Sequence, residues 1–234
     1  MHIVYKAETR GLTNIDWLKS YHTFSFGNYF NRNRMSFGAL RVINDDIIAP
    51  NQGFDTHPHK NMEIITYVLS GELTHQDSLG TSEVLKPGEV QRMSAGTGIL
   101  HSEHNKSKNT AVHLLQIWIV PQNMDIKPRY NQQIINYDSE LSLVVSRDGR
   151  NGSLQIEQDA DCYALKALSG TIILLPHQSS ESGWIHIIEG KIKTWWGEEL
   201  SAGDSFGFYQ EGQNLNLEIL ESCHALLFSL PALD

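Results

Sequence analysis

The stretch MEIITYVLSGELTHQDSLG, from Met62 to Gly80, indicates the fold of this chain. Apolar and β-branched residues dominate up to Leu69, and Gly71 follows as a turn residue. A second short run begins at Leu73 and ends in a polar segment that closes at Gly80. This pattern predicts a β-strand, a glycine turn, a second strand and a second turn.

The same pattern continues downstream. The segment EVLKPGEVQRM predicts two strands around Pro87 and Gly88, and the segments GTGILHSEH and AVHLLQIWIVP each predict another strand. Turn signals recur about every 8–15 residues, and no segment of about 15 residues has a convincing helical period. The sequence therefore predicts an all-β sandwich or barrel.

The second half of the chain repeats the first half weakly. IITYVLSGEL (Ile64–Leu73) is similar to GWIHIIEGKI (Gly183–Ile192), and LKPGEV (Leu85–Val90) is similar to LSAGDS (Leu200–Ser205). We interpret this as two similar β-units in tandem. Chance is the alternative, because strand–glycine–strand is common in β proteins. The stretch from Pro121 to about Gly152 is expected to be a connector with turns.

Composition excludes several classes of function. The net charge is -9, from 18 basic and 27 acidic residues, which argues against a nucleic-acid surface. No apolar run is long enough to span a membrane, and the N-terminus lacks a signal-peptide pattern. Cys162 and Cys223 form no CxxC motif, which suits a reducing compartment, although the two could still pair. We expect a soluble, cytoplasmic protein.

Two pairs of metal-ligand residues share one spacing. His57 and His59 are two residues apart, and so are His101 and Glu103. Alternate residues of a strand face the same side, so each pair would project two side chains roughly 7 Å apart along its strand. If the two strands are neighbours, three imidazoles and a carboxylate converge. That donor set suits a divalent first-row metal, iron above all when coordination positions stay open.

The other histidines are weaker candidates. His104 follows Glu103 directly and should face the opposite side, and His113 lies in an apolar strand where a structural role is more common. His75 and Glu63 share the parity of the candidate ligands, which makes them candidates for supporting contacts. The isolated histidines are expected to be ordinary surface or hydrogen-bonded residues: His2, His22, His177, His186 and His224.

These motifs resemble a known family. HPHKNMEIITYVLSG (His57–Gly71) and LKPGEVQRMSAGTGILHSEHN (Leu85–Asn105) resemble the pirin family of the cupin superfamily, and WLKSYHTFSFGNYF (Trp17–Phe30) is similar to bacterial pirin-like proteins. The resemblance covers essentially the whole first half and extends weakly through the second half.

The resemblance implies a bicupin, with two tandem cupin jelly-roll β-barrels. Residues 1–130 would form the metal-binding barrel, residues 131–152 a connector, and residues 153–234 a cupin-like barrel without metal. By the same resemblance, the metal ligands would be His57, His59, His101 and Glu103. The metal would be one divalent ion per chain, with Fe(II) first and Zn, Ni, Mn, Cu or Co as alternatives.

The identity of the carboxylate ligand has a rival. In the general cupin pattern, the glutamate after HxH is a ligand, and that residue is Glu63 here. The pirin resemblance favours Glu103 instead. In the second half, the corresponding positions are Pro176, Gln178, Asn216 and Glu218, so the resemblance implies no second metal site.

The resemblance also implies an activity. Bacterial members of the family act as quercetin dioxygenases, so the expected reaction opens a flavonol ring with O2, and Glu103 is the candidate catalytic base. The expected partners are a flavonol-like small molecule and O2, with no nucleic acid and no membrane. The alternative is an iron-dependent redox sensor of the pirin type that acts on a protein partner without turnover.

Overall fold

The computed structural model describes residues 1–176, 182–209, 212 and 215–232. Within these ranges the chain is almost entirely β-structure, and its helices are two short 3-10 turns, η1 (Ala7–Thr9) and η2 (Arg150–Gly152). No helix in the described ranges has the length and apolar character needed to cross a membrane. The all-β expectation is confirmed.

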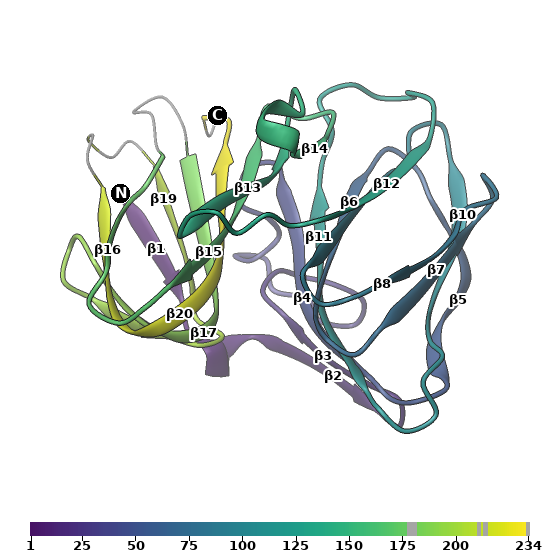
Figure 1. Cartoon of the computed structure of the whole chain (residues 1–234), viewed down its shortest axis with the longest axis horizontal. Coiled ribbons are helices and arrows are strands. Elements are labelled where there is room, and N and C mark those ends of the chain that lie inside the picture. The colour runs from purple at the N-terminus through teal and green to yellow at the C-terminus, as the bar shows by residue number, and fades with distance from the viewer. Residues whose placement is uncertain (177–181, 210–211, 213–214, 233–234) are drawn as a thin grey trace. The chain divides into compact units, whose positions relative to one another are not determined.

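The chain divides into two compact units. The N-terminal unit comprises residues 11–135 and 156–158, and the C-terminal unit comprises residues 1–10, 136–155 and 159–234. Figure 1 shows the strands of both units, coloured along the chain.

The N-terminal unit is built from two sheets. Its larger sheet follows the order β12-β9-β6-β11-β4-β3-β2. The strands of this sheet are β2 (Gly11–Ile15), β3 (Leu18–His22), β4 (Leu40–Ile48), β6 (Glu63–Ser70), β9 (Glu89–Ser94), β11 (Val112–Ile119) and β12 (Arg129–Ile134). Its smaller sheet follows the order β5-β10-β7-β8, with β5 (Gln52–His59), β7 (Leu73–Asp77), β8 (Ser82–Leu85) and β10 (Ile99–Asn105).

The two sheets of the N-terminal unit pack their apolar sides together. One core cluster joins β3, β4, β6 and β11 of the larger sheet to β7 and β8 of the smaller one, through Leu18, Ile48, Val68, Leu73, Leu85, Val112 and Leu114. A second cluster consists of Ile64, Met93, Ala95 and Ile99. These clusters fix the distance between the sheets and therefore the space in which the candidate ligands lie.

The quoted stretch forms the elements that its sequence predicts. Met62–Gly80 contains β6, the turn at Gly71 and β7, and the segment around Pro87 and Gly88 joins β8 to β9. Gly71 has φ +76°, and a Cβ there would lie 2.6 Å from the Ala111 carbonyl oxygen. Only glycine meets both demands at this turn, which carries the chain from the larger sheet to the smaller one.

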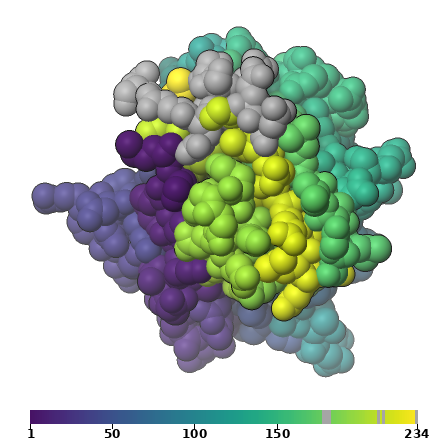
Figure 2. Space-filling model, turned by 90° about the vertical axis from the view of Figure 1, so that its left-hand side faces the viewer, coloured from purple at the N-terminus to yellow at the C-terminus, as the bar shows by residue number. Residues whose placement is uncertain are grey.

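The C-terminal unit contains one large sheet with the main order β1-β19-β17-β20-β15-β13-β14. Its strands are β1 (His2–Tyr5), β13 (Leu141–Ser146), β14 (Leu154–Gln155), β15 (Asp161–Ala167), β16 (Ile172–Leu174), β17 (Ser182–Thr194), β18 (Glu199–Ser201), β19 (Ser205–Tyr209) and β20 (Asn216–Leu230). Figure 2 shows the purple N-terminal residues against the yellow-green residues of this unit, as the pairing of β1 with β19 requires.

The two glycines that the predicted repeat aligns share a backbone conformation but differ in their setting. Gly190 has φ +84°, close to the φ of +76° at Gly71. In the first half, however, the chain changes sheets at the glycine, whereas β17 runs through Gly190 as a single strand. The pairing of β17 with β20 shifts register on both sides of this glycine, so the second half bends at a bulge rather than at a turn.

The two compact units also begin and end at other residues than the expected domains. Residues 1–10 lie with the C-terminal unit, because β1 pairs with β19. The expected connector, residues 131–152, contains most of β12 and all of β13, which pair with β9 and β15 respectively. Turn signals in the sequence did not reveal these strands, because strand pairing depends on partners distant in the chain.

The packing of the C-terminal core requires a glycine at position 183, and a substitution there can test this requirement. Gly183 lies opposite Phe208 in the β17–β19 pairing, and a Cβ at Gly183 would lie 2.1 Å from the Phe208 ring. The ring is 1% exposed, so it has no free space into which to move. Gly183→Ala should therefore lower the free energy of unfolding by about 1–3 kcal/mol, measured by denaturant titration. Adding Phe208→Leu should restore part of the loss, and wild-type stability of Gly183→Ala alone would contradict this account.

Candidate metal centre

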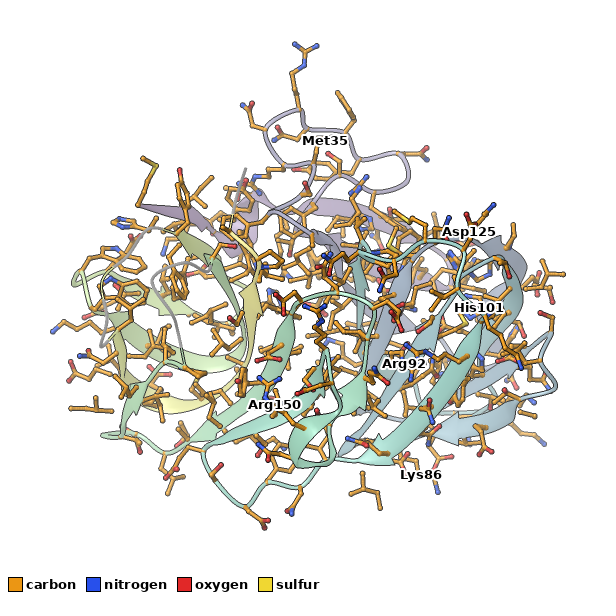
Figure 3. All side chains as sticks on the ribbon, turned by 90° about the horizontal axis from the view of Figure 1, so that it is seen from above. Met35, Lys86, Arg92, His101, Asp125 and Arg150 are labelled. Atoms are coloured by element: carbon orange, nitrogen blue, oxygen red, sulfur yellow. The ribbon has the colours of Figure 1, made fainter. Side chains whose placement is uncertain are left out.

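Strand pairing brings the two predicted pairs of residues together. Strands β5 and β10 are antiparallel neighbours, and His57 lies directly opposite His101. The ring centroids are 4.8 Å apart for His57 and His59, 4.4 Å for His57 and His101, and 4.9 Å for His59 and His101. One ring nitrogen of each histidine lies within 4.8 Å of the others, a spacing that suits a shared metal ion. Figure 3 labels His101 among the strands of this unit.

Two of the three imidazoles, those of His59 and His101, are held in their neutral form. Burial, together with the neighbouring histidines, lowers the pKa of His59 to about 4. The same causes lower the pKa of His101 to about 3. A neutral imidazole has the lone pair that a metal needs, so these side chains are ready to bind without losing a proton first.

The hydrogen bonds of these histidines leave nitrogens for a metal. The Nδ1–H of His57 donates to the carbonyl oxygen of Asp55 at 2.7 Å, which leaves Nε2 as the free donor atom. His101 is 1% exposed, and neither of its ring nitrogens has a hydrogen-bond partner. A buried imidazole without partners is costly, and a metal ion would satisfy one of its nitrogens. The donor set therefore fits a divalent first-row ion.

Glu103 approaches the cluster from the same strand as His101. Its carboxylate is 2% exposed and accepts hydrogen bonds from Gln116 Nε2 at 2.7 Å and from Thr66 Oγ1 at 3.3 Å. Glu103, His101 and His75 form a second group whose donor atoms lie within 4.8 Å of one another. His101 thus belongs to both groups, and Glu103 is grouped with His75 rather than with His57 and His59.

A row of polar side chains crosses the inner face of the larger sheet and supports Glu103. The register places one such residue on each of six neighbouring strands, in the order His22, Asn44, Gln116, Thr66, Gln91 and Gln132. His22 Nδ1 bonds Asn44 at 2.8 Å, and Gln91 donates to Thr66 at 3.3 Å. Sequence reasoning missed this row, because its members become neighbours only through strand register.

Glu63 lies in a different environment. Its carboxylate is 1% exposed and accepts a hydrogen bond from Ser94 Oγ at 2.7 Å. Burial raises the pKa of Glu63 to about 7, and the positive charges of Arg92 and Arg129 partly oppose that rise. Neither group of metal-type donors found among the described residues includes Glu63. The shared parity in the sequence did not bring it to the cluster, because Glu63 lies on β6 of the larger sheet.

His75 lies beside His101, with ring centroids 5.3 Å apart. It is fully buried, stacks on Tyr130 with ring centroids 4.5 Å apart, and lies 3.1 Å from Asp77 through its Nε2. Its Nδ1 has no partner. The side chain of Asp77 is also fully buried, so His75 is fixed in orientation beside His101.

The remaining histidines lie apart from the cluster. His104 pairs with Asp55 at 3.5 Å, His113 bonds Asp45 at 2.6 Å, and His186 bonds Ser205 at 2.7 Å. His224 lies in the C-terminal unit, where burial lowers its pKa to about 4, and His2 stacks on Trp196. His177, with Gln178, lies outside the described residues.

A cavity of about 250 Å³ opens beside the candidate ligands. Its lining includes His57, His59 and Glu103, with an aromatic and apolar wall formed by Leu18, Phe26, Phe54 and Trp118. Its polar lining comes from β2, β3, β4 and β11, through Thr13, Ser20, His22, Asn44, Asp46 and Gln116. The loop after Phe26 borders the cavity and then projects outward, and Figure 3 shows Met35 near its tip.

Comparison with known proteins identifies the family. The sequence profile described as "Pirin" matches residues 5–119, and the profile described as "Quercetinase C-terminal cupin domain" matches residues 143–230. The chain belongs to the pirin family. Both halves of this pirin are thus covered by profiles, including the second half, where the resemblance of the sequence was weak.

Two relatives from different bacteria match this pirin over nearly their whole length. It is 45% identical over 226 residues to a quercetin 2,3-dioxygenase of Escherichia coli, which covers 97% of each chain. It is 38% identical to a putative quercetin 2,3-dioxygenase of Pasteurella multocida, over 96% of this chain and 97% of the relative. The solved structure of the bacterial pirin YhhW from Escherichia coli, in complex with nickel(II), superposes with a TM-score of 0.95 at 44% identity, covering 100% of both chains. The coarse fold expected from the sequence, an all-β cupin-type protein, is confirmed.

The two glutamates give a direct test of the carboxylate ligand. Glu103→Gln keeps an oxygen donor beside His101 but removes its charge, so metal affinity should fall roughly tenfold or more, measured by competition with a chelator. Glu63→Gln is the matched control and should bind metal as the wild type does. Loss of metal from Glu63→Gln with normal binding by Glu103→Gln would assign the ligand role to Glu63.

Glu63 should also leave a signature in the pH dependence of stability. Its pKa is raised from 4.5 to about 7, so between these values the folded state holds a proton that the unfolded chain has released. The free energy of unfolding should therefore fall as the pH rises through this window, by at most about 1.4 kcal/mol per pH unit from this group. Denaturant titrations at pH 5, 6 and 7 should show a flatter profile for Glu63→Gln than for the wild type. Identical slopes in the two proteins would refute the buried, protonated state of Glu63.

Proposed function

We propose that this protein is a metal-dependent dioxygenase that opens the ring of flavonols such as quercetin with O2. One divalent metal per chain, with Fe(II) as the first choice, is held by His57, His59, His101 and Glu103. The observation that carries the proposal is the convergence of three imidazoles at the edge of an aromatic-walled cavity, with both ring nitrogens of His101 lacking hydrogen-bond partners. The names of the relatives support the same activity.

The donor set supports a first-row metal without selecting one by geometry. Three imidazoles and a carboxylate suit iron, and they also accept nickel, zinc, manganese, copper or cobalt. The related pirin with nickel(II) agrees with this breadth. A bound ion would supply Lewis acidity that favours the deprotonated form of a flavonol hydroxyl, and a route for electrons between that ligand and O2.

The protein itself contributes a positioned base. Glu103 is the proton acceptor for the flavonol hydroxyl, since its carboxylate lines the cavity beside the histidines. Gln116 holds one carboxylate oxygen at 2.7 Å, so the other is the freer of the two. Thr66 has one hydroxyl proton and two acceptors, Glu103 at 3.3 Å and Gln116 at 3.1 Å. Its hydroxyl can turn away from Glu103 when that carboxylate takes up a proton.

The cavity wall gives a reason for an aromatic substrate. Phe54 and Trp118 border the cavity near the histidines, with the His59 and Trp118 rings 4.9 Å apart in an edge-on arrangement. Flat apolar surfaces of this kind favour a planar ring system and exclude water from the place where charge develops.

The C-terminal unit is proposed to lack a metal and a catalytic role of its own. Both groups of metal-type donors found in the described part of the chain lie in the N-terminal unit. Asn216 and Glu218, which align with His101 and Glu103, lie on β20, and His186 is bonded to Ser205. We assign a cupin-type barrel with metal to the N-terminal unit and a metal-free cupin-type barrel to the C-terminal unit.

A reducing, cytoplasmic location is part of the proposal. Cys162 and Cys223 are both buried and carry free thiols. Burial raises the pKa of the Cys162 thiol above its ordinary range and that of Cys223 to about 12, so both stay protonated and unreactive.

Oxygen uptake with quercetin tests the proposed activity. The purified protein should hold about one metal per chain by elemental analysis, consume O2 with quercetin, and stop when a chelator removes the metal. At equal metal content, Glu103→Gln should lose turnover by a factor on the order of 10²–10⁴, because a general base is removed. Glu63→Gln should keep wild-type turnover per metal. Full metal occupancy without turnover on any flavonol would instead favour the redox-sensor role.

A further inference from the structure

Asp46 lines the same cavity as the candidate ligands His57, His59 and Glu103. It lies on β4, its side chain is 3% exposed, and it lines the cavity together with Ser20, its partner on β3. Asp46 lies next to the polar row on β4. Asn44, which belongs to that row, is two residues earlier on the same strand. The mechanism above assigns no role to Asp46.

One carboxylate oxygen of Asp46 lacks a partner. Ser20 provides a side-chain hydrogen bond to this carboxyl group, whereas Oδ1 is buried without any hydrogen-bond partner. The neighbouring polar groups of the cavity differ in this respect. His22 bonds both Asn44 and Thr13, each at 2.8 Å, and Gln116 bonds Glu103 at 2.7 Å. A buried carboxylate oxygen without a partner, beside a cavity, marks a place where a ligand group would be stabilised.

The environment of Asp46 favours the neutral carboxyl group. Complete burial raises its pKa to about 7, Ser20 opposes that rise, the charges of Glu103 and Asp45 add to it, and His113 again opposes it. Near neutral pH the protonated and ionised forms are therefore both accessible. The protonated form can donate to a ligand oxygen, and the ionised form can accept from a ligand hydroxyl.

We propose that Asp46 is a specificity-determining residue that hydrogen-bonds a phenolic hydroxyl of the substrate, other than the hydroxyl that faces the histidines. The proposal rests on the proposed function and names its substrate class more narrowly, as polyhydroxylated planar aromatics. A hydroxyl both donates and accepts, so it satisfies Asp46 in either protonation state. A methoxy group only accepts, and a bare C–H does neither, so both should be discriminated against.

The lining of the cavity supports a ligand with several polar groups. His57, His59, Glu103, Asp46 and Ser20 line the cavity together with the apolar side chains of Phe54 and Trp118. The indole Nε1 of Trp118 is another cavity-lining atom that is buried without a partner, and it can donate to a further ligand oxygen. A planar molecule with several hydroxyls would match this set of groups.

A ladder of flavonols tests the role of Asp46 by binding, independently of turnover. The probes are 3-hydroxyflavone, galangin, kaempferol and quercetin, which add hydroxyls stepwise to one core, with methoxy analogues of the hydroxylated members. Dissociation constants are measured without O2 on the metal-loaded protein. In the wild type, one step of the ladder should strengthen binding by about tenfold, and methylation of that hydroxyl should remove the gain. The wild-type result alone already tests the proposal, because uniform affinity along the ladder would overturn it.

The variants assign the discriminating step to Asp46. Asp46→Leu and Asp46→Ala should abolish the gain at that step while leaving the affinity for 3-hydroxyflavone near the wild-type value. Asp46→Asn, which still donates and accepts, should retain most of the gain. Asp45→Asn is the matched control, since Asp45 lies on the other face of β4, bonded to His113, and should leave the ladder unchanged. Equal weakening of all four flavonols by Asp46→Leu would show a merely structural role and overturn the proposal.

The same experiment separates this inference from the proposed function. If the binding measurement shows discrimination at one step of the ladder but the protein consumes no O2 with these flavonols, the dioxygenase activity is overturned and the role of Asp46 stands. If all four flavonols are turned over with equal affinity and equal kcat/KM, the role of Asp46 is overturned and the dioxygenase activity stands. If none of the four flavonols binds, both the dioxygenase activity and the role of Asp46 are overturned.

Discussion

The hydrogen bonds to the Glu103 carboxylate are the constraint on which the rest of the site depends. A buried carboxylate is stable only when donors compensate for lost water, and here Gln116 and Thr66 supply them from the larger sheet. Those two residues belong to a row of polar side chains that lies between the two apolar core clusters of the N-terminal unit. The row therefore fixes which strand faces which, because a register slip by one residue would place polar groups in the apolar core.

Where the smaller sheet faces this row, it carries histidines instead of apolar side chains. His57, His59 and His101 are crowded together, and burial favours the neutral form of the His59 and His101 rings. A neutral imidazole keeps one N–H and one lone pair, and burying both nitrogens of His101 without hydrogen-bond partners costs free energy. This arrangement is best explained by a ligand that accepts electron pairs, and the geometry of His101, with both ring nitrogens lacking hydrogen-bond partners, makes a metal ion the natural candidate.

The C-terminal unit uses similar strands for a different end. Its core cluster is apolar, and β17 contributes Ile185, Ile187 and Ile192 to it. Gly190 retains the left-handed conformation of Gly71, but the strand continues past it with a shifted register. Local chain conformation can thus be shared between the two units while the chemistry is not, since the chemistry depends on which side chains the register brings face to face.

The sequence by itself determined the all-β class, the turn at Gly71, and the two pairs His57/His59 and His101/Glu103, because strand periodicity and turn chemistry are local properties. The motifs around these residues also identified the pirin family. Only the tertiary structure decided that His57 lies opposite His101, that Glu63 bonds Ser94 away from the cluster, and that Gln116 and Thr66 hold Glu103. It also decided that residues 1–10 join the C-terminal unit, and that Asp46 faces the cavity. Each of these outcomes depends on the pairing of strands far apart in the chain, which residue spacing along one strand does not encode.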